Sequence, residues 1–447
     1  MSQTEDQPAN QDAKKADGSD LRSPVDATTR IDSGTTRREF LRQTLRGSGA
    51  VGAGLTLGAS TWPAGAAEKG TPRVGRRVPF GRTGLEIPDI SFGSFALEDD
   101  EDLVRYALDR GITHFDTAES YADGRSEVVL GRALEGRRHE VTLTTKYWAR
   151  PEDTTERQMK KLDQSLKNLK TDYIDVYLNH AVNDVDRLSS EHWQRFVQDA
   201  KKAGKIRAIG MSGHSGRLAE CLVYALDEKL VDAILVAYNF SQQPSFGQKV
   251  KRRLRDLASG FDIIATHPEL PKILARAHEE GVGVMAMKTL RGARKNDMRP
   301  YEMPDRTFAQ AAFRFVLADP SVDGLVVSMK SREMIDEYLE ASGSGPPDDE
   351  DLALLTRYES LVAGSTCQVG CGACLGSCPS DVPIADVMRI RMYERDYALP
   401  EIAAREYAAL PVDAAACLEC SGAPCAQACP NGLAIAPLNR ETHRRLA

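Results

Sequence analysis

Short apolar runs alternate with helix-like stretches eight times between residues 90 and 342, and this alternation is the strongest constraint on the fold. The runs lie at residues 90–95, 112–116, 141–146, 173–179, 206–211, 232–236, 282–287 and 323–327. Most of them precede apolar residues at the 3.6-residue spacing of a helix, as in residues 155–168. Eight alternating strands and helices predict an α/β fold, a (β/α)8 TIM barrel with a parallel sheet. An open doubly wound sheet is the alternative, but no G-x-G-x-x-G follows the first run.

Four chemically compatible side chains lie at the predicted carboxyl ends of three consecutive strands, where barrels carry their active sites. Asp116 and Lys146 end the second and third runs, and His180 directly follows the fourth. Tyr121 follows five residues after Asp116. A free tyrosine has a pKa near 10, and a nearby ammonium group lowers it. We therefore expect Tyr121 to protonate a carbonyl oxygen as hydride reaches the carbon, with Asp116 fixing Lys146 and His180 orienting the carbonyl.

The segment from Gly111 to Tyr121 (GITHFDTAESY), continuing to Glu127, resembles the signature of the aldo/keto reductases. Residues 145–146, 178–180, 209–212 and 283–288 match further family segments in the same order. The resemblance covers residues 74–342. It implies a barrel that binds NADPH without a Rossmann fold, with Tyr121 as the general acid/base, Lys146 and Asp116 as its tuning pair and His180 as the residue that orients the substrate.

The cofactor positions match the family less closely than the catalytic ones. The resemblance implies NADP(H) contacts from Ser212, Asn239, Lys288, Lys330 and Ser331. Lys330 and Ser331 suit a phosphate, because an ammonium and a hydroxyl both donate hydrogen bonds to it, whereas Lys288 faces the diphosphate or is a solvated loop charge. Positions 213, 240, 287 and 338 carry Gly, Phe, Met and Tyr, where the family has Asn, Gln, an aromatic residue and Asn.

Eight of the nine cysteines lie in two runs near the C-terminus, behind a Ser-, Gly-, Pro- and Asp-rich linker at 343–352. The first run is Cys367, Cys371, Cys374 and Cys378, and the second is Cys417, Cys420, Cys425 and Cys429; each ends in Cys-Pro. The runs resemble bacterial ferredoxins, although each has extra residues between its cysteines. The resemblance implies two [4Fe–4S] clusters in a small α-rich domain at 353–447. In that resemblance the fourth cysteine of each run binds the other cluster, which implies that Cys429 joins the first three and Cys378 joins the second three.

Zinc and disulfide bonds are the alternatives for these eight cysteines. The ending x3-Cys-Pro favours iron over zinc. The ninth cysteine, Cys221, lies in a helical apolar pattern and is predicted to be an inert core thiol.

The N-terminus is predicted to be a targeting segment. Residues 1–34 are rich in Asp, Ser, Gln and Thr, which predicts a disordered tail. Residues 35–66 contain Arg37 and Arg38 before Phe-Leu, then an uncharged Ala/Gly-rich stretch that ends in A-G-A. This pattern resembles a twin-arginine signal peptide and predicts export through the Tat translocase to the periplasm or another extracytoplasmic space, with membrane anchoring if the signal is not cleaved. Because that route carries folded proteins, it is compatible with clusters inserted before export.

Together these features predict an exported aldo/keto-reductase-like oxidoreductase. NADP(H) and a small carbonyl or alcohol substrate exchange hydride in the barrel, and the clusters pass electrons to or from a redox protein partner. The net charge of -7 gives no electrostatic reason to expect nucleic acid. Two alternatives are a redox enzyme fed only by its clusters, without nicotinamide, and a non-catalytic electron-transfer or scaffold protein.

Overall fold

The computed structural model describes residues 70–214, 217–242, 269–291, 298–303, 305–362, 367, 371–396 and 399–447. All of them belong to one compact unit, Glu68–Ala447. The predicted tail at 1–34 and the predicted signal peptide at 35–66 lie outside the described residues. Within the described part, no helix combines the length and the apolar character that crossing a bilayer requires.

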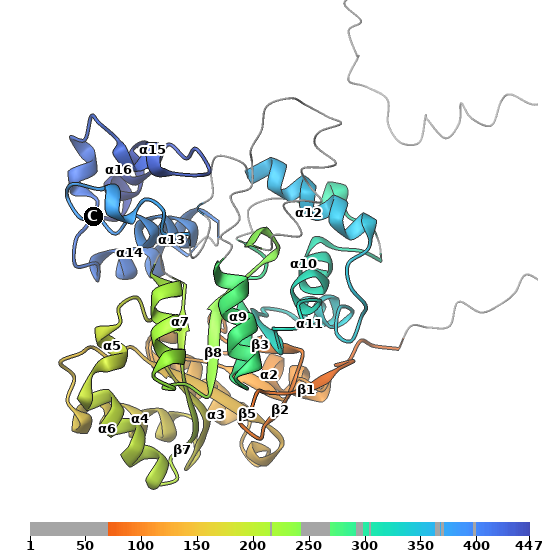
Figure 1. The fold of residues 1–447 in the computed structure, drawn as a ribbon. Helices are drawn as coiled ribbons and strands as arrows, with labels where there is room; N and C mark the ends of the chain where they lie inside the picture. The colour runs from red at the N-terminus through yellow and green to blue at the C-terminus, as the bar shows by residue number, and fades with distance from the viewer. Residues whose placement is uncertain are drawn as a thin grey trace, which may run out of the picture. The chain divides into compact units, whose positions relative to one another are not determined.

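Eight parallel strands close into a barrel in the order β10-β3-β4-β5-β6-β7-β8-β9 (Figure 1). The (β/α)8 barrel prediction is therefore confirmed, and each predicted strand lies within two residues of an observed one. The strands are β3 (Ile90–Gly93), β4 (His114–Asp116), β5 (Thr142–Tyr147), β6 (Ile174–Asn179), β7 (Ile206–Gly213), β8 (Ala233–Ala237), β9 (Gly283–Met287) and β10 (Gly324–Ser328).

Helices surround the strands and bury their apolar faces against them. In α6, for example, Trp193 and Phe196 pack against Tyr177 of β6. These helices are α2 (Glu101–Asp109), α3 (Arg125–Ala133), α4 (Thr155–Asn168), α5 (Asp186–Ser189), α6 (Glu191–Lys202), α7 (Leu218–Asp227), α9 (Glu269–Glu279), α10 (Phe308–Leu317) and α11 (Arg332–Leu339). The continuous apolar runs follow from this arrangement, because a barrel strand is buried on both faces.

A small antiparallel hairpin, β1 (Arg77–Pro79) and β2 (Glu86–Pro88), closes the end of the barrel where the strands begin. Val78 and Phe80 of this hairpin join the apolar cluster that fills the barrel interior. Gly81 has φ +50°, and a Cβ there would lie 2.3 Å from the backbone nitrogen of Gly283. Only glycine fits this close approach, so the hairpin is fixed against the start of β9.

Helix α12 (Asp349–Val362) begins inside the predicted linker and packs on the barrel. Leu355 and Tyr358 of α12 share a buried cluster with Phe308 of α10 and with Phe240, and the rings of Phe308 and Tyr358 lie 4.6 Å apart. Residues 353–362 thus pack with the barrel, although the sequence groups them with the cysteine-rich part.

The C-terminal segment, residues 367–447, has its own apolar core. Its helices are α13 (Ile384–Arg395), α14 (Pro400–Ala408), α15 (Pro424–Ala428) and α16 (Ile435–Leu446). Val387, Tyr407 and Ile435 are buried in this core together with several of the cysteines, and Phe95 from the barrel packs against it. The core is therefore continuous with the mouth of the barrel on one side.

Candidate active site

One cavity of about 170 Å³ contains all four predicted catalytic residues. Asp116 is the last residue of β4, Lys146 lies near the end of β5, and His180 directly follows β6. Tyr121 begins a short 3-10 turn after β4. The parallel order of these neighbouring strands brings the four side chains to one end of the barrel.

Lys146 is the centre of the site. Its ammonium donates hydrogen bonds to Asp116 Oδ1 at 2.7 Å, to the carbonyl oxygen of Thr117 at 2.5 Å and to Tyr121 Oη at 3.4 Å. The Lys146 and Asp116 side chains are 1% and 4% exposed, so water cannot replace these bonds. The ring of His180 meets that of Tyr121 edge-on, with the ring centres 5.7 Å apart. A carbonyl oxygen placed near Tyr121 Oη therefore has a phenol and an imidazole beside it.

Both Tyr121 and His180 are held in their neutral forms. Burial raises the pKa of Tyr121 well above its ordinary value, and the charge of Asp116 adds to the effect. Burial also lowers the pKa of His180, and the nearby cations Lys146 and Arg187 lower it further. The expectation that Lys146 lowers the pKa of Tyr121 is thus not met, because burial of the phenol raises this pKa and the charge of Asp116, 2.7 Å from the Lys146 ammonium, raises it further.

The turn that carries Tyr121 has an unusual backbone. Ala122, Asp123 and Gly124 are three consecutive residues with positive φ, at 49°, 55° and 83°. Non-glycine residues rarely adopt this conformation, and such strain is retained where the surroundings hold it. Arg405 of the C-terminal segment lies 3.0 Å from an Asp123 carboxylate oxygen and 3.5 Å from the carbonyl oxygen of Ser120. The C-terminal segment therefore contacts the turn on both sides of Tyr121.

Three of the five predicted cofactor residues, Ser212, Lys288 and Lys330, line the cavity. Ser212 Oγ accepts a hydrogen bond from the backbone N–H of Ala181 at 2.9 Å. Lys288 donates to Tyr393 Oη at 2.7 Å, so it is not a solvated loop charge. These residues give the cavity a polar wall and two ammonium groups beyond the catalytic one.

The other two predicted cofactor residues have local structural partners. Asn239 Oδ1 accepts hydrogen bonds from the Ser241 hydroxyl at 2.7 Å and from its backbone N–H at 3.2 Å. Ser331 caps helix α11 by accepting from the backbone N–H of Met334 at 3.2 Å. Neither residue is among the described residues that line the cavity. Phe240, which stands where the family has Gln, is buried under α12 instead.

Sequence reasoning missed the residues that the C-terminal segment adds to this cavity. Tyr393 of α13 and Arg405 and Glu406 of α14 line it together with the catalytic residues. Tyr393 lies 105 positions from its partner Lys288 in the chain. No local pattern marks such a contact, because it depends on how two separate cores pack together.

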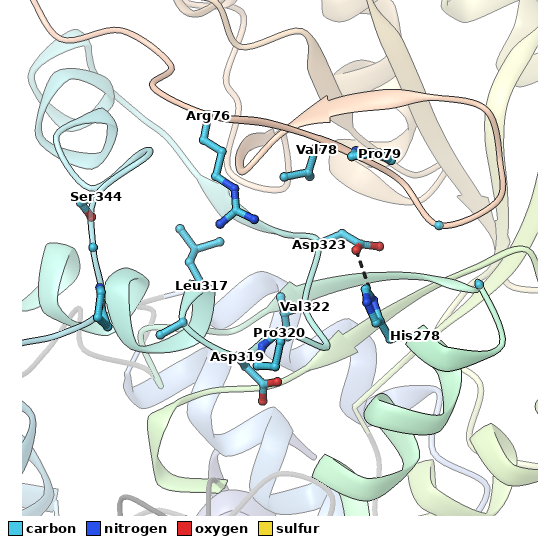
Figure 2. A pocket seen from close by; sticks show the side chains of 15 residues that line it. Arg76, Val78, Pro79, His278, Leu317, Asp319, Pro320, Val322, Asp323 and Ser344 are labelled. Carbon is cyan, nitrogen blue, oxygen red and sulfur yellow. Dashed lines mark ion pairs between the residues drawn. The ribbon is translucent and has the colours of Figure 1, made fainter.

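A second, open hollow of about 700 Å³ lies at the other end of the barrel, beside the hairpin (Figure 2). His278 Nδ1 lies 3.6 Å from Asp323 Oδ1 there, and Asp323 Oδ2 accepts a hydrogen bond from the backbone N–H of Val284. Arg76 lies on the hairpin side of the hollow (Figure 2). None of the predicted catalytic residues lines this hollow, so we place the active site at the opposite end.

Four cysteines from both runs surround one small cavity in the C-terminal segment: Cys367, Cys371, Cys374 and Cys429. Burial raises the pKa of Cys367 to about 12, and the thiols of Cys374, Cys371 and Cys429 contribute to this shift. These four residues, which we name the first cysteine group, are the same four that the ferredoxin resemblance combines.

Of the other five cysteines, the four in the C-terminal segment are named here the second cysteine group: Cys378, Cys417, Cys420 and Cys425. Burial raises the pKa of Cys417 and of Cys425, and the thiols of Cys378 and Cys420 raise both further. The Asn439 amide donates to Cys417 Sγ at 3.7 Å. Among the described residues, which include all nine cysteines, no two cysteines form a disulfide bond. No group of three or more His, Cys, Asp or Glu in the described part is placed to hold one metal ion.

The barrel and its Tyr–Lys–Asp–His cavity define an oxidoreductase of the TIM-barrel class. The sequence matches the aldo/keto reductase family over residues 80–359. This chain therefore belongs to the aldo/keto reductase family, as the resemblance of residues 111–121 implied. The matched region includes the barrel and most of α12 and ends before the cysteine-rich segment.

Several characterised and solved proteins are similar to the chain. It is 26% identical over 321 residues to L-glyceraldehyde 3-phosphate reductase of Escherichia coli O157:H7, covering 62% of this chain and 90% of that protein. It is 35% identical over 145 residues to methylglyoxal reductase DkgB of the same organism, covering 32% and 54%. The solved holo form of aldo-keto reductase AKR11C1 from Bacillus halodurans is 21% identical, with a TM-score of 0.49 and coverage of 63% and 95%.

Proposed function

We propose that this protein reduces a small carbonyl substrate with NADP(H) in the barrel and carries electrons through two [4Fe–4S] clusters in its C-terminal segment. The observation that carries the reductase part is the position of Lys146, 2.7 Å from Asp116 and 3.4 Å from Tyr121 Oη in a cavity that His180 shares. Two relatives named as reductases of small aldehydes support a carbonyl of that size.

In this mechanism the neutral phenol of Tyr121 donates a proton to the carbonyl oxygen, and Lys146 holds the hydroxyl in position. Neutral His180 hydrogen-bonds the same oxygen and fixes its direction. NADPH, when bound, supplies the hydride. Ser212, Lys288 and Lys330 line the cavity and fit the polar and phosphate groups of that cofactor. We assign no cofactor contact to Asn239 and Ser331. The Asn239 side chain accepts hydrogen bonds from Ser241, and the Ser331 hydroxyl accepts one from the backbone N–H of Met334.

A second candidate is a redox enzyme that uses its clusters and no soluble nicotinamide. Two observations favour it. Lys288 donates a hydrogen bond to Tyr393, and the preceding residue is Met287, where the family has an aromatic residue. Phe240 is buried in the core, and Tyr338 takes the place of an Asn. Turnover of NADPH with a common aldehyde distinguishes the two, because only the first candidate predicts it.

The grouping of the cysteines supports the cluster proposal. Iron–sulfur cubanes bind four thiolates each. The first cysteine group lines one cavity, and Cys378 and Cys420 of the second group raise the pKa of Cys417 and Cys425, which supports two sets of four. The Asn439 amide near Cys417 Sγ fits a hydrogen bond to a cluster ligand. When bound, such clusters accept and release single electrons.

Iron and sulfide analysis of the anaerobically purified full chain tests this proposal. We expect about eight irons per chain, and about four after Cys374→Ser, because the other group keeps its cluster. Cys221→Ser in helix α7 is the matched control, since burial raises the pKa of this barrel thiol to about 12 and it lies outside both groups. Zinc in place of iron, or equal iron loss in both variants, contradicts the proposal.

We further propose export through the Tat translocase, based on Arg37 and Arg38. Fractionation of cells that express the full chain tests it: replacement of both arginines by lysine keeps the charge and should leave the protein in the cytoplasm. The same double change at Arg76 and Arg77 is the control. Equal export of all three proteins contradicts the proposal.

A further inference from the structure

The turn that carries the catalytic Tyr121 has a backbone that its side chains do not favour. Ala122 and Asp123 have φ values of 49° and 55°, and Gly124 follows with 83°. Only glycine adopts this left-handed region at no steric cost, so the turn gains free energy by relaxing unless its surroundings hold it. The position of Tyr121 Oη in the cavity therefore depends on the contacts made by residues 120–124.

The barrel holds the two ends of this turn. At its entrance the backbone N–H of Glu119 donates to the carbonyl oxygen of Lys146 at 3.1 Å, and at its exit helix α3 begins at Arg125. The Arg125 side chain also donates to the carbonyl oxygen of Ala122 at 3.2 Å, three positions away in the chain. These contacts fix where the turn starts and ends, and the residues between them contact the C-terminal segment.

Arg405 of α14 makes that contact. Its guanidinium donates to Asp123 Oδ1 at 3.0 Å and to the carbonyl oxygen of Ser120 at 3.5 Å, across 282 and 285 positions of the chain. The two acceptors lie on either side of Tyr121 in the chain, so one planar group spans the turn. Arg405, Ser120 and Tyr121 all line the catalytic cavity. The contact is therefore made beside the catalytic residue and not on a remote surface.

The ring of Tyr121 is also packed from the side of the C-terminal segment. The Phe95 ring meets it edge-on, with the ring centres 5.1 Å apart, and the Phe95 ring centre lies 5.8 Å from that of Tyr393 in α13. Phe95 packs against the apolar core of the C-terminal segment. That segment thus reaches Tyr121 in two ways, through its backbone turn and through its ring.

We propose that Arg405 is a positioning residue for Tyr121, because it holds the left-handed turn and so keeps the phenol beside Lys146. This inference rests on the proposed reductase function, since Arg405 acts only through the proton donor of that reaction. It makes the C-terminal segment necessary for full catalysis in the barrel, apart from any electrons that the segment carries.

The exposure of the Arg405–Asp123 pair limits the expected size of the effect. The two side chains are 46% and 84% exposed, so the ion pair by itself is weak. A contact shifts the balance between a productive and a relaxed turn only by its own free energy. For the ion pair together with the hydrogen bond to Ser120, we expect kcat to fall about five- to thirtyfold in Arg405→Ala, which corresponds to about 1 to 2 kcal/mol.

Arg132→Ala is the matched control for Arg405→Ala. Arg132 in α3 lies 2.8 Å from Asp99 and 3.3 Å from Glu101. The Arg132 and Asp99 side chains are 41% and 77% exposed, close to the values of the Arg405 pair, and neither is among the described residues that line the cavity. Both variants should shift the midpoint of urea unfolding by a similar small amount, whereas only Arg405→Ala should lower kcat.

The full chain and its variants are assayed for kcat and KM with glyceraldehyde at saturating NADPH. We expect Arg405→Ala to lower kcat with KM nearly unchanged, because a proton donor acts in the transition state. Asp123→Asn keeps a residue that tolerates positive φ and leaves the hydrogen bond to Ser120, so it should lose less. Arg405→Lys keeps the charge but not the planar fork, so its kcat should lie between those of the parent and Arg405→Ala.

A double variant separates positioning from a general structural role. If Arg405 acts through the phenol hydroxyl, adding Arg405→Ala to Tyr121→Phe should lower kcat by less than about twofold, because the group that Arg405 positions is already absent. In the parent background the same substitution should have its full effect.

Three results overturn this inference alone. Equal factors for Arg405→Ala in the parent and in Tyr121→Phe would give Arg405 a general structural role. A higher KM with unchanged kcat would make Arg405 a substrate-binding residue. Equal kcat values for Arg405→Ala and Arg132→Ala would show that the barrel holds the turn by itself. No reduction of glyceraldehyde by the parent chain refutes the proposed function, and this inference with it.

Discussion

Replacement of Tyr121 by Phe removes one hydroxyl and tests the proton donor directly. In the described part of the chain, that hydroxyl accepts a hydrogen bond from Lys146 Nζ at 3.4 Å. A bond of this length is weak, so we expect the free energy of unfolding to change by less than about 1 kcal/mol. Lys146 keeps its shorter bonds to Asp116 and Thr117, so the rest of the site should remain in place.

The effect on catalysis should be much larger. A positioned general acid contributes roughly 10²- to 10⁴-fold to a rate, which corresponds to about 2.7 to 5.4 kcal/mol of transition-state stabilisation. The assay follows NADPH absorbance with glyceraldehyde at saturating cofactor. We expect kcat to fall by that factor while KM stays nearly constant, because the proton moves only in the transition state.

Tyr177→Phe is the matched control for this experiment. Tyr177 is fully buried in β6, and its hydroxyl has no hydrogen-bond partner in the described part of the chain. Removal of an unsatisfied buried hydroxyl should be neutral or slightly stabilising and should leave kcat unchanged. If Tyr121→Phe retains kcat within about threefold of the parent, far inside the range expected for a lost general acid, the assignment is refuted.

Two further predictions concern the charges of the site. Tyr121 has a raised pKa and His180 a lowered one, so both side chains should stay neutral near neutral pH. We therefore expect kcat/KM for reduction to be constant from about pH 6 to about pH 9. A decline in kcat/KM with a midpoint near pH 8 would mean that an ammonium group lowers the pKa of Tyr121 after all. Lys146→Met leaves Asp116 buried without its cation and should cost about 3–5 kcal/mol in urea unfolding, against about 0–1 kcal/mol for Lys161→Met, which breaks a partly exposed ion pair. Equal costs would contradict the central role of the buried pair.

The barrel and the catalytic residues could be predicted because their signals are local. Each strand is a short apolar run, and parallel barrel strands are buried on both faces, so the runs are easy to recognise. Asp116, Lys146 and His180 come at strand ends, and the carboxyl ends of neighbouring parallel strands meet in space. Their meeting follows from the strand order alone.

The polar wall of the cavity could not be predicted in the same way. Tyr393 reaches the site only because the core of the C-terminal segment packs against Phe95 at the barrel mouth. Ser331 and Asn239 match family positions in sequence, yet their side chains have short-range backbone or hydroxyl partners. Hydrogen bonds of this kind depend on how each side chain is oriented, and a sequence motif does not give that orientation.

The pKa of Tyr121 also required the structure. A lysine close to a tyrosine lowers the tyrosine pKa only if its charge is not already compensated. The carboxylate of Asp116 lies closer to Lys146 than the phenol does, at 2.7 Å against 3.4 Å, and burial acts on all three groups. Which of these effects dominates the pKa of Tyr121 depends on interatomic distances, and the amino-acid sequence does not give those distances.

The most direct test of the account is an equilibrium fluorescence titration of the anaerobically purified full chain with NADPH, with NADH alongside. We predict saturable binding that prefers NADPH and weakens in Lys330→Ala, because Lys330 lines the cavity and suits the 2′-phosphate. Absence of binding by folded, iron-replete protein would contradict the account and leave the cysteine-rich segment as the source of electrons.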